Sequence, residues 1–121
     1  SYFITDAFVG EHSLELELKV SGDVHNLRID PAMDSCICKV KEFTFNGMRI
    51  PLKDKKVVSI NGRLAGNTFV FSTEDPNINL HMEGLNRKAT NTIWLSMDVN
   101  RLERDLCADL ENELKRIIDK Y

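Results

Sequence analysis

The fold is indicated most clearly by Asn26–Pro31 (NLRIDP) and by Ser35–Phe43 (SCICKVKEF), which follows it. In the first run two apolar side chains flank Arg28 and point away from it, because successive residues of a β-strand face opposite sides of the sheet. Asp30 and Pro31 end this strand, since proline has no amide hydrogen for a strand ladder and holds the residue before it in an extended conformation. Alternation then resumes in the second run. We therefore predict one strand, a stop at Asp-Pro and a second strand.

A second unit of the same kind follows later in the chain. Phe69–Pro76 (FVFSTEDP) leads into Asn77–Met82 (NINLHM), so an apolar run again ends in Asp-Pro before a new alternating run. Between the two units, Asn46-Gly47 separates alternating segments. Asn-Gly is a strong hairpin signal, because a type I′ turn needs positive φ at both central residues. The chain is thus predicted to hold two strand–Asp-Pro–strand units with a hairpin between them.

The flanking segments have the same period. Leu14–Val20 alternates leucine or valine with charged residues, and Gly22-Asp23 is predicted to turn this strand into the next one as a hairpin. Thr92–Met97 (TIWLSM) is the last predicted strand. Short strands at close spacing, separated by turn signals, indicate an antiparallel β-sandwich of the jelly-roll kind, which we assign to residues 1–97.

From Asp98 the period changes to that of an α-helix. Asp98 is a suitable N-cap, and an apolar stripe that repeats over about 11 residues predicts a nearly straight amphipathic helix over residues 98–121. Such a stripe must be buried against something. The helix is expected to dock on the sandwich, to pair with a second copy as a homodimer, or to connect to a following domain. Its apolar residues are Val99, Leu102, Leu106, Leu110, Leu114, Ile117, Ile118 and Tyr121.

Length and composition limit the class of protein. A chain of 121 residues with 42% hydrophobic and 29% charged residues is typical of one globular domain. The net charge is −3 and no basic run is present, which argues against a nucleic-acid partner. No apolar stretch approaches the roughly 18 residues of a membrane span. Because the chain opens at Ser1 without a methionine or a signal peptide, we expect it to be a piece of a longer protein.

The three cysteines, an odd number, argue against a disulfide scaffold. Cys36 and Cys38 share one face of a predicted strand, where a bridge would need unusual geometry, and Cys107 stands alone on the predicted helix. The three histidines show no metal-ligand spacing. The sequence therefore predicts reduced thiols in a cytoplasmic, reducing compartment, with neither a metal nor a cofactor.

No catalytic residue is predicted, because the sequence has no Asp-x-Asp triplet, no Gly-rich phosphate loop and no Gly-x-Ser-x-Gly elbow. Asp30 and Asp75 could form the carboxylate pair of a glycoside hydrolase. The better interpretation is that each caps the end of a strand through an Asx turn, so that Asp30-Pro31 and Asp75-Pro76 are structural. Arg28 could clamp a phosphate or a sugar carboxylate. The alternative is that it pairs with an acid across the sheet.

Trp94 is the second candidate for ligand contact, beside Arg28. β-Sandwiches that bind sugars usually do so with exposed aromatic side chains whose faces stack on sugar C–H groups. Trp94 is well placed for this role, in the middle of a predicted strand and on the side opposite its apolar neighbours. It either stays exposed beside polar groups or packs beneath the C-terminal helix, where Leu102, Leu106 or Leu110 would cover it.

The Leu-Arg-Ile-Asp-Pro core, the strand that ends before Asn46-Gly47 and the later Thr-Glu-Asp-Pro-Asn-Ile segment resemble the β-sandwich accessory module of large bacterial cell-surface polysaccharide glycosyltransferases, including rhamnan-synthesis-type proteins. The resemblance covers roughly Leu14 to Val99. It implies a non-catalytic domain that binds a glycan or positions the neighbouring domains of a glycosyltransferase in bacterial polysaccharide biosynthesis. The alternative is a purely structural or oligomerising module without a ligand.

Overall fold

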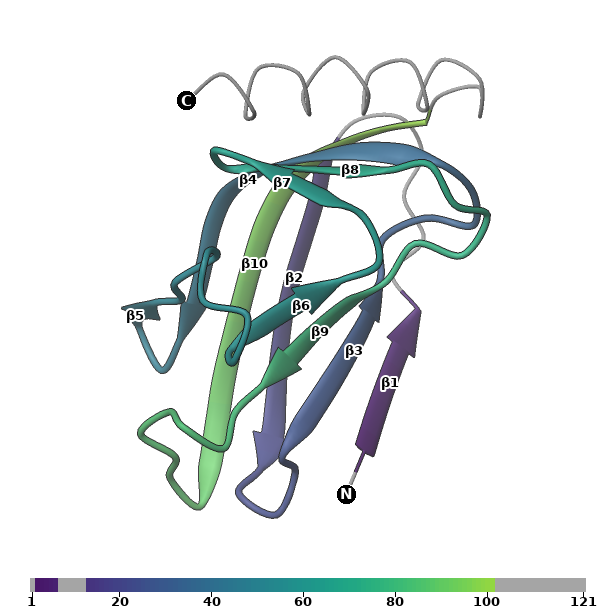
Figure 1. Cartoon of the computed structure of the whole chain (residues 1–121). Helices are drawn as coiled ribbons and strands as arrows, with labels where there is room; N and C mark the ends of the chain where they lie inside the picture. Colours follow the sequence, from purple (N-terminus) through teal and green to yellow (C-terminus); the bar gives the residue numbers. More distant parts are fainter. Residues whose placement is uncertain (1, 7–12, 102–121) are drawn as a thin grey trace.

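Two β-sheets make up the described part of the chain, which comprises residues 2–6 and 13–101 of this computed structural model. Its strands are β1 (Tyr2–Asp6), β2 (Ser13–Ser21), β3 (Asn26–Asp30), β4 (Cys36–Phe45), β5 (Met48–Arg49), β6 (Val58–Ile60), β7 (Arg63–Ala65), β8 (Thr68–Phe71), β9 (Ile78–His81) and β10 (Thr90–Arg101). The smaller sheet has the order β1-β3-β9-β6. The larger has the order β2-β10-β4-β8-β7, with β5 paired to β4. Figure 1 shows the smaller sheet lying across the larger one.

The hydrophobic core lies between the two sheets, because strand alternation points the apolar side chains of both inward. Leu27, Ile29 and Leu80 from the smaller sheet and Leu95 from the larger are fully buried and belong to one cluster. The predicted alternation of Leu27 and Ile29 with the half-buried Arg28 is confirmed. So is a β-rich, sandwich-like fold.

The predicted start of the C-terminal helix at Asp98 is wrong, because β10 continues as a strand to Arg101. Val99 pairs with Cys38 of β4 and is fully buried, and Arg101 pairs with Cys36. The alternation of apolar residues in β10 continues to Val99. Because β4 is long enough to pair with this part of the chain, the strand continues beyond Asp98, the predicted N-cap. The rest of the predicted helix, residues 102–121, lies outside the described residues. Nowhere in residues 2–6 and 13–101 does a helix long and apolar enough to cross a membrane occur.

The two sheets are mainly antiparallel, as predicted for the sandwich, with one parallel pair among the described strands, β1 with β3. The reason is the position of β2. This strand belongs to the larger sheet, so the chain leaves the smaller sheet after β1 and returns to it at β3 in the same direction (Figure 1). The remaining strand pairs are antiparallel.

Some turn signals form hairpins within one sheet, and others lie where the chain crosses to the other sheet. Asn46 and Gly47 have φ of 52° and 82°, which confirms the predicted hairpin between β4 and β5. The turn that begins at Gly22 joins β2 to β3 in the other sheet, so the hairpin predicted there is wrong. Gly62 lies in a second crossover, from β6 to β7. A Cβ at Gly62 would lie 2.3 Å from the carbonyl oxygen of Val70, so this close passage requires glycine.

Cys36 and Cys38 both point inward from β4, as predicted, and are buried and unbridged. Their sulfur atoms lie 3.7 Å apart. The hydrogen bond to Cys36, burial and repulsion by the neighbouring thiolate all raise the pKa of the Cys38 thiol, so it stays protonated in the fold. Cys107 lies outside the described residues.

Candidate functional site

The outer face of the smaller sheet carries a continuous set of polar side chains, here called the polar face. β3, β9 and β6 lie side by side in this sheet, and hydrogen-bonding residues alternate along them with buried apolar ones. The register places Asn79 between Arg28 and Ser59. Short segments before β9 and after β6 extend the same surface. The polar face comprises Asn26, Arg28, Asp30, Ser59, Asn61, Asp75, Asn77, Asn79 and His81.

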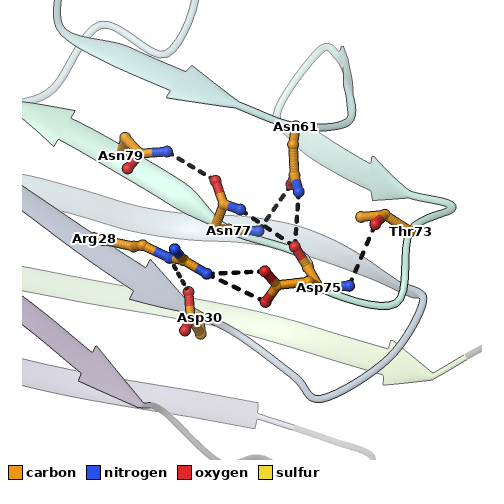
Figure 2. Close-up of polar contacts among 7 residues, drawn as sticks. All are labelled: Arg28, Asp30, Asn61, Thr73, Asp75, Asn77 and Asn79. Carbon is orange, nitrogen blue, oxygen red and sulfur yellow. Dashed lines mark hydrogen bonds and ion pairs between the residues drawn. The ribbon is translucent and has the colours of Figure 1, made fainter.

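Arg28 joins the two Asp-Pro units at one end of the polar face (Figure 2). Its Nε donates to Asp30 Oδ1 at 2.8 Å, and its Nη2 lies 3.2 and 3.1 Å from Oδ1 and Oδ2 of Asp75. The side chains of Arg28 and Asp30 are 26% and 18% exposed, whereas that of Asp75 is 73% exposed. The guanidinium therefore binds two carboxylates, that of Asp30, which is shielded and on the same strand, and that of Asp75, which is exposed and belongs to the second Asp-Pro unit. Both following prolines, Pro31 and Pro76, are buried.

Three asparagines fix the backbone around Asp75 (Figure 2). Asn61 Nδ2 donates to the Asp75 carbonyl at 2.7 Å, and Asn61 Oδ1 accepts from the Asn77 amide at 2.9 Å. Asn77 Nδ2 also donates to the Asp75 carbonyl, at 3.2 Å, while Asn77 Oδ1 accepts from Asn79 Nδ2 at 2.8 Å. The Asp75 amide in turn donates to Thr73 Oγ1 at 3.3 Å. The second Asp-Pro stop is thus held by side-chain amides as well as by Arg28.

His81 links the other end of the polar face across three strands. Its Nδ1 lies 2.7 Å from Asn26 Oδ1 on β3, and its Nε2 lies 2.8 Å from Ser59 Oγ on β6. Because the amide oxygen of Asn26 can only accept, Nδ1 donates to it, and Nε2 shares the second hydrogen bond with the Ser59 hydroxyl. This chain of contacts fixes the orientation of all three side chains.

Trp94 lies elsewhere, on the outer face of the larger sheet. It is half-buried on β10, and its Nε1 donates a hydrogen bond to Glu42 Oε1 of β4. Its cross-strand neighbours are Glu17 and Thr44. We call this surface the Trp94 face. Leu102, Leu106 and Leu110, the predicted cover of Trp94, lie outside the described residues.

The structure therefore brings together Arg28, Asp30 and Asp75 but separates them from Trp94, since the two predicted binding residues project from different sheets. Sequence reasoning missed most of the polar face, in particular Asn26, Ser59, Asn61, Asn77, Asn79 and His81. The signal was present in Asn77–His81 (NINLH), where every residue that faces away from the core carries an amide or an imidazole.

The polar face offers hydrogen-bond donors and acceptors on one side of the smaller sheet, which suits a ligand rich in hydroxyl groups. Among the residues that the structure describes, no group of three or more His, Cys, Asp and Glu could hold a metal ion. No protein-family model matches the chain, and searches of curated proteins and of solved structures find no match either. The side chains on the two outer faces are therefore the features that indicate a function.

Proposed function

We propose that this domain is a non-catalytic accessory module that binds glycan on its polar face and belongs to a glycosyltransferase of bacterial polysaccharide biosynthesis. The observation that carries the binding proposal is the density of fixed, half-exposed hydrogen-bonding side chains on β3, β9 and β6. Sugar hydroxyls both donate and accept, and carboxylate, amide, imidazole and guanidinium groups supply both partners.

The contacts within the polar face support binding because they orient its groups before a ligand arrives. Asn79, Asn77 and Asn61 form one chain of bonds, and Asn26, His81 and Ser59 form another. Fixing side chains in advance lowers the entropy that is lost when a ligand binds. Oxygen atoms with two lone pairs, such as Asn77 Oδ1, can accept a further hydrogen bond from a hydroxyl.

Features outside the polar face support the other two parts of the proposal, which are the glycosyltransferase as parent enzyme and the cytoplasm as compartment. The link to a polysaccharide glycosyltransferase rests on the resemblance of the two Asp-Pro units to the accessory modules of such enzymes. A cytoplasmic location is supported by the buried, unbridged Cys36 and Cys38, since a reducing compartment keeps thiols free. Trp94 is proposed as a secondary contact only, because its indole N–H is already bound to Glu42.

A glycan-binding screen with matched variants tests the proposal. The protein is run through native gels that contain neutral or acidic polysaccharides, and retardation measures binding. Asn77→Ala with Asn79→Ala should abolish the retardation that the wild type shows, because the amide on β9 and the one just before it are both lost. Thr44→Ala, on the Trp94 face, is the control and should retain binding. Binding that survives the double change but fails in the control would contradict the assignment to the polar face.

The non-catalytic part of the proposal has its own test. Ser59, His81 and Asn26 stand in the order of nucleophile, base and orienting group that serine hydrolases use. We assign them to ligand positioning, so a fluorophosphonate probe, which labels activated serines, should leave Ser59 unmodified. A stoichiometric adduct on Ser59, found by mass spectrometry, would contradict that assignment.

A purely structural module is the second candidate, and the contacts of Arg28 favour it. A guanidinium that ties Asp30 to Asp75 stabilises the junction of the two Asp-Pro units without any ligand. This candidate predicts no retardation by any polysaccharide, together with a loss of stability when Arg28 is replaced.

A further inference from the structure

The polar face has an unbalanced set of charges. Among its nine residues the only cation is Arg28, and it lies between the carboxylates of Asp30 and Asp75. His81 adds no charge to this count, in which histidine is taken as neutral at pH 7. The other five residues are asparagines or a serine. One positive charge against two negative charges leaves the polar face with a net charge of −1.

The contacts of Arg28 determine whether an anionic ligand can bind to the polar face. Its Nε and Nη2 are directed at carboxylates, with three donor–acceptor distances between 2.8 and 3.2 Å. A phosphate or sugar carboxylate that binds Nε or Nη2 would compete with Asp30 or Asp75 for the guanidinium and would lie close to both of these like charges. Like charges about 4 Å apart repel by about 1 kcal/mol even in water, and by more beside a protein surface.

An uncharged sugar is not repelled by these carboxylates and can form hydrogen bonds with them. The Asp75 side chain is 73% exposed, so its oxygens are accessible to hydroxyl donors without leaving Arg28. A carboxylate has room for about four hydrogen bonds, and bonds to an ionised acceptor are stronger than neutral ones. Two adjacent hydroxyls could therefore bind the Asp75 carboxylate while neighbouring amides bind the next hydroxyls of the ring.

We propose that the polar face selects uncharged glycans with adjacent free hydroxyls and discriminates against uronic acids and phosphorylated sugars. This inference rests on the proposed function and narrows it to a substrate class. Arg28 is then a positioning residue, which holds Asp75 toward the ligand, and not the clamp for an anionic sugar that the sequence allowed.

The test uses matched polymers that differ only in charge. Neutral mannan, β-glucan and rhamnan are compared in affinity electrophoresis, and mannan and β-glucan are also used after oxidation of the C6 hydroxyl to a carboxylate. The wild type should bind mannan or β-glucan. It should bind the C6-oxidised form of the same polymer with an affinity that is lower by about tenfold or more. Asp75→Asn removes one charge from an exposed side chain and should reduce the preference to about threefold or less.

Glu17→Gln is the control, because it removes the same charge from the exposed part of the Trp94 face. It should leave the preference unchanged. An equal effect of both substitutions would overturn the inference, since total charge would then explain the selectivity. Equal or tighter binding of the oxidised polymers would overturn it too, while leaving glycan binding intact. No binding to any polymer would overturn the proposed function, and the inference with it.

Discussion

The two outer faces of the sandwich are built from the same alternation but are chemically different. On the polar face, side chains from β3, β9 and β6 bind one another at 2.7–2.8 Å across three strands, and most of them are half-buried. On the Trp94 face, Glu15, Glu17 and Lys19 of β2 are exposed, and the ion pair of Lys41 with Asp98 has both side chains at 40–50% exposure. One face is an ordered network and the other is a largely solvated surface.

This contrast indicates which of the two faces is better suited to bind a ligand. A solvated charge on a sheet stabilises little and holds no fixed geometry, because water screens it. Side chains that hold one another across strands keep their positions, which a ligand can use. The polar face also connects the two Asp-Pro units through Arg28. The same residues therefore contribute to the stability of the domain and to the proposed binding.

The largest expected effect concerns the core beneath the two faces. Leu80→Ala removes a fully buried side chain under the polar face and should lower the free energy of unfolding by about 2–5 kcal/mol. Leu16→Ala, under the Trp94 face, should cost clearly less, because Leu16 is only half-buried on the edge strand β2. Urea denaturation of both variants checks this. Equal losses would mean that the two faces cover the core equally well.

The next effect compares the ion pairs of the two faces. Arg28→Met leaves the Asp30 carboxylate, with its side chain only 18% exposed, without its guanidinium partner, so the free energy of unfolding should fall by about 1–3 kcal/mol. Thermal melts at neutral pH measure the loss. If Arg28→Met melts like the wild type, the junction of the two Asp-Pro units does not depend on Arg28.

A smaller effect is expected from the chain of bonds through His81. Ser59→Ala removes the hydrogen bond to Nε2 and should cost about 0.5–1.5 kcal/mol. In the wild type, NMR of the imidazole nitrogens should show the proton on Nδ1. A ring with its proton on Nε2 would contradict the arrangement of Asn26, His81 and Ser59.

The smallest effect belongs to the Trp94 face. Lys41→Met breaks the exposed ion pair with Asp98 and should change the free energy of unfolding by no more than about 1 kcal/mol. The same thermal melts measure this change. A loss of unfolding free energy as large as that of Arg28→Met would mean that the ion pairs of the two faces stabilise the domain equally.

Local patterns in the sequence predict the individual strands well and their assembly poorly. Alternation identified β2, β3, β4 and β10, and Asn46-Gly47 identified the hairpin, because side-chain direction and turn backbone are local properties. The same kind of turn signal failed at Gly22, where the chain crosses to the other sheet. Which sheet a strand joins depends on partners distant in sequence, and no short motif encodes it. Val99 satisfied helical and strand periods alike, and pairing with Cys38 decided the outcome.

The candidate site was predicted only in part for the same reason. Arg28, Asp30 and Asp75 were all singled out, yet their meeting depends on β3 lying beside β9, which alternation cannot reveal. The asparagines and His81 were overlooked because each alone resembles an ordinary exposed residue. Only the register between three strands turns them into one surface.

A single NMR titration distinguishes glycan binding by the polar face from glycan binding by the Trp94 face. The side-chain amides of Asn26, Asn61, Asn77 and Asn79 and the indole N–H of Trp94 give separate signals in a single ¹⁵N–¹H correlation spectrum. On addition of the neutral polysaccharide fragment that retards the protein, we expect the signals of the asparagines of the polar face to shift in a saturable manner while the indole signal of Trp94 stays in place. A saturable shift of the indole signal with the asparagine signals unmoved would contradict it.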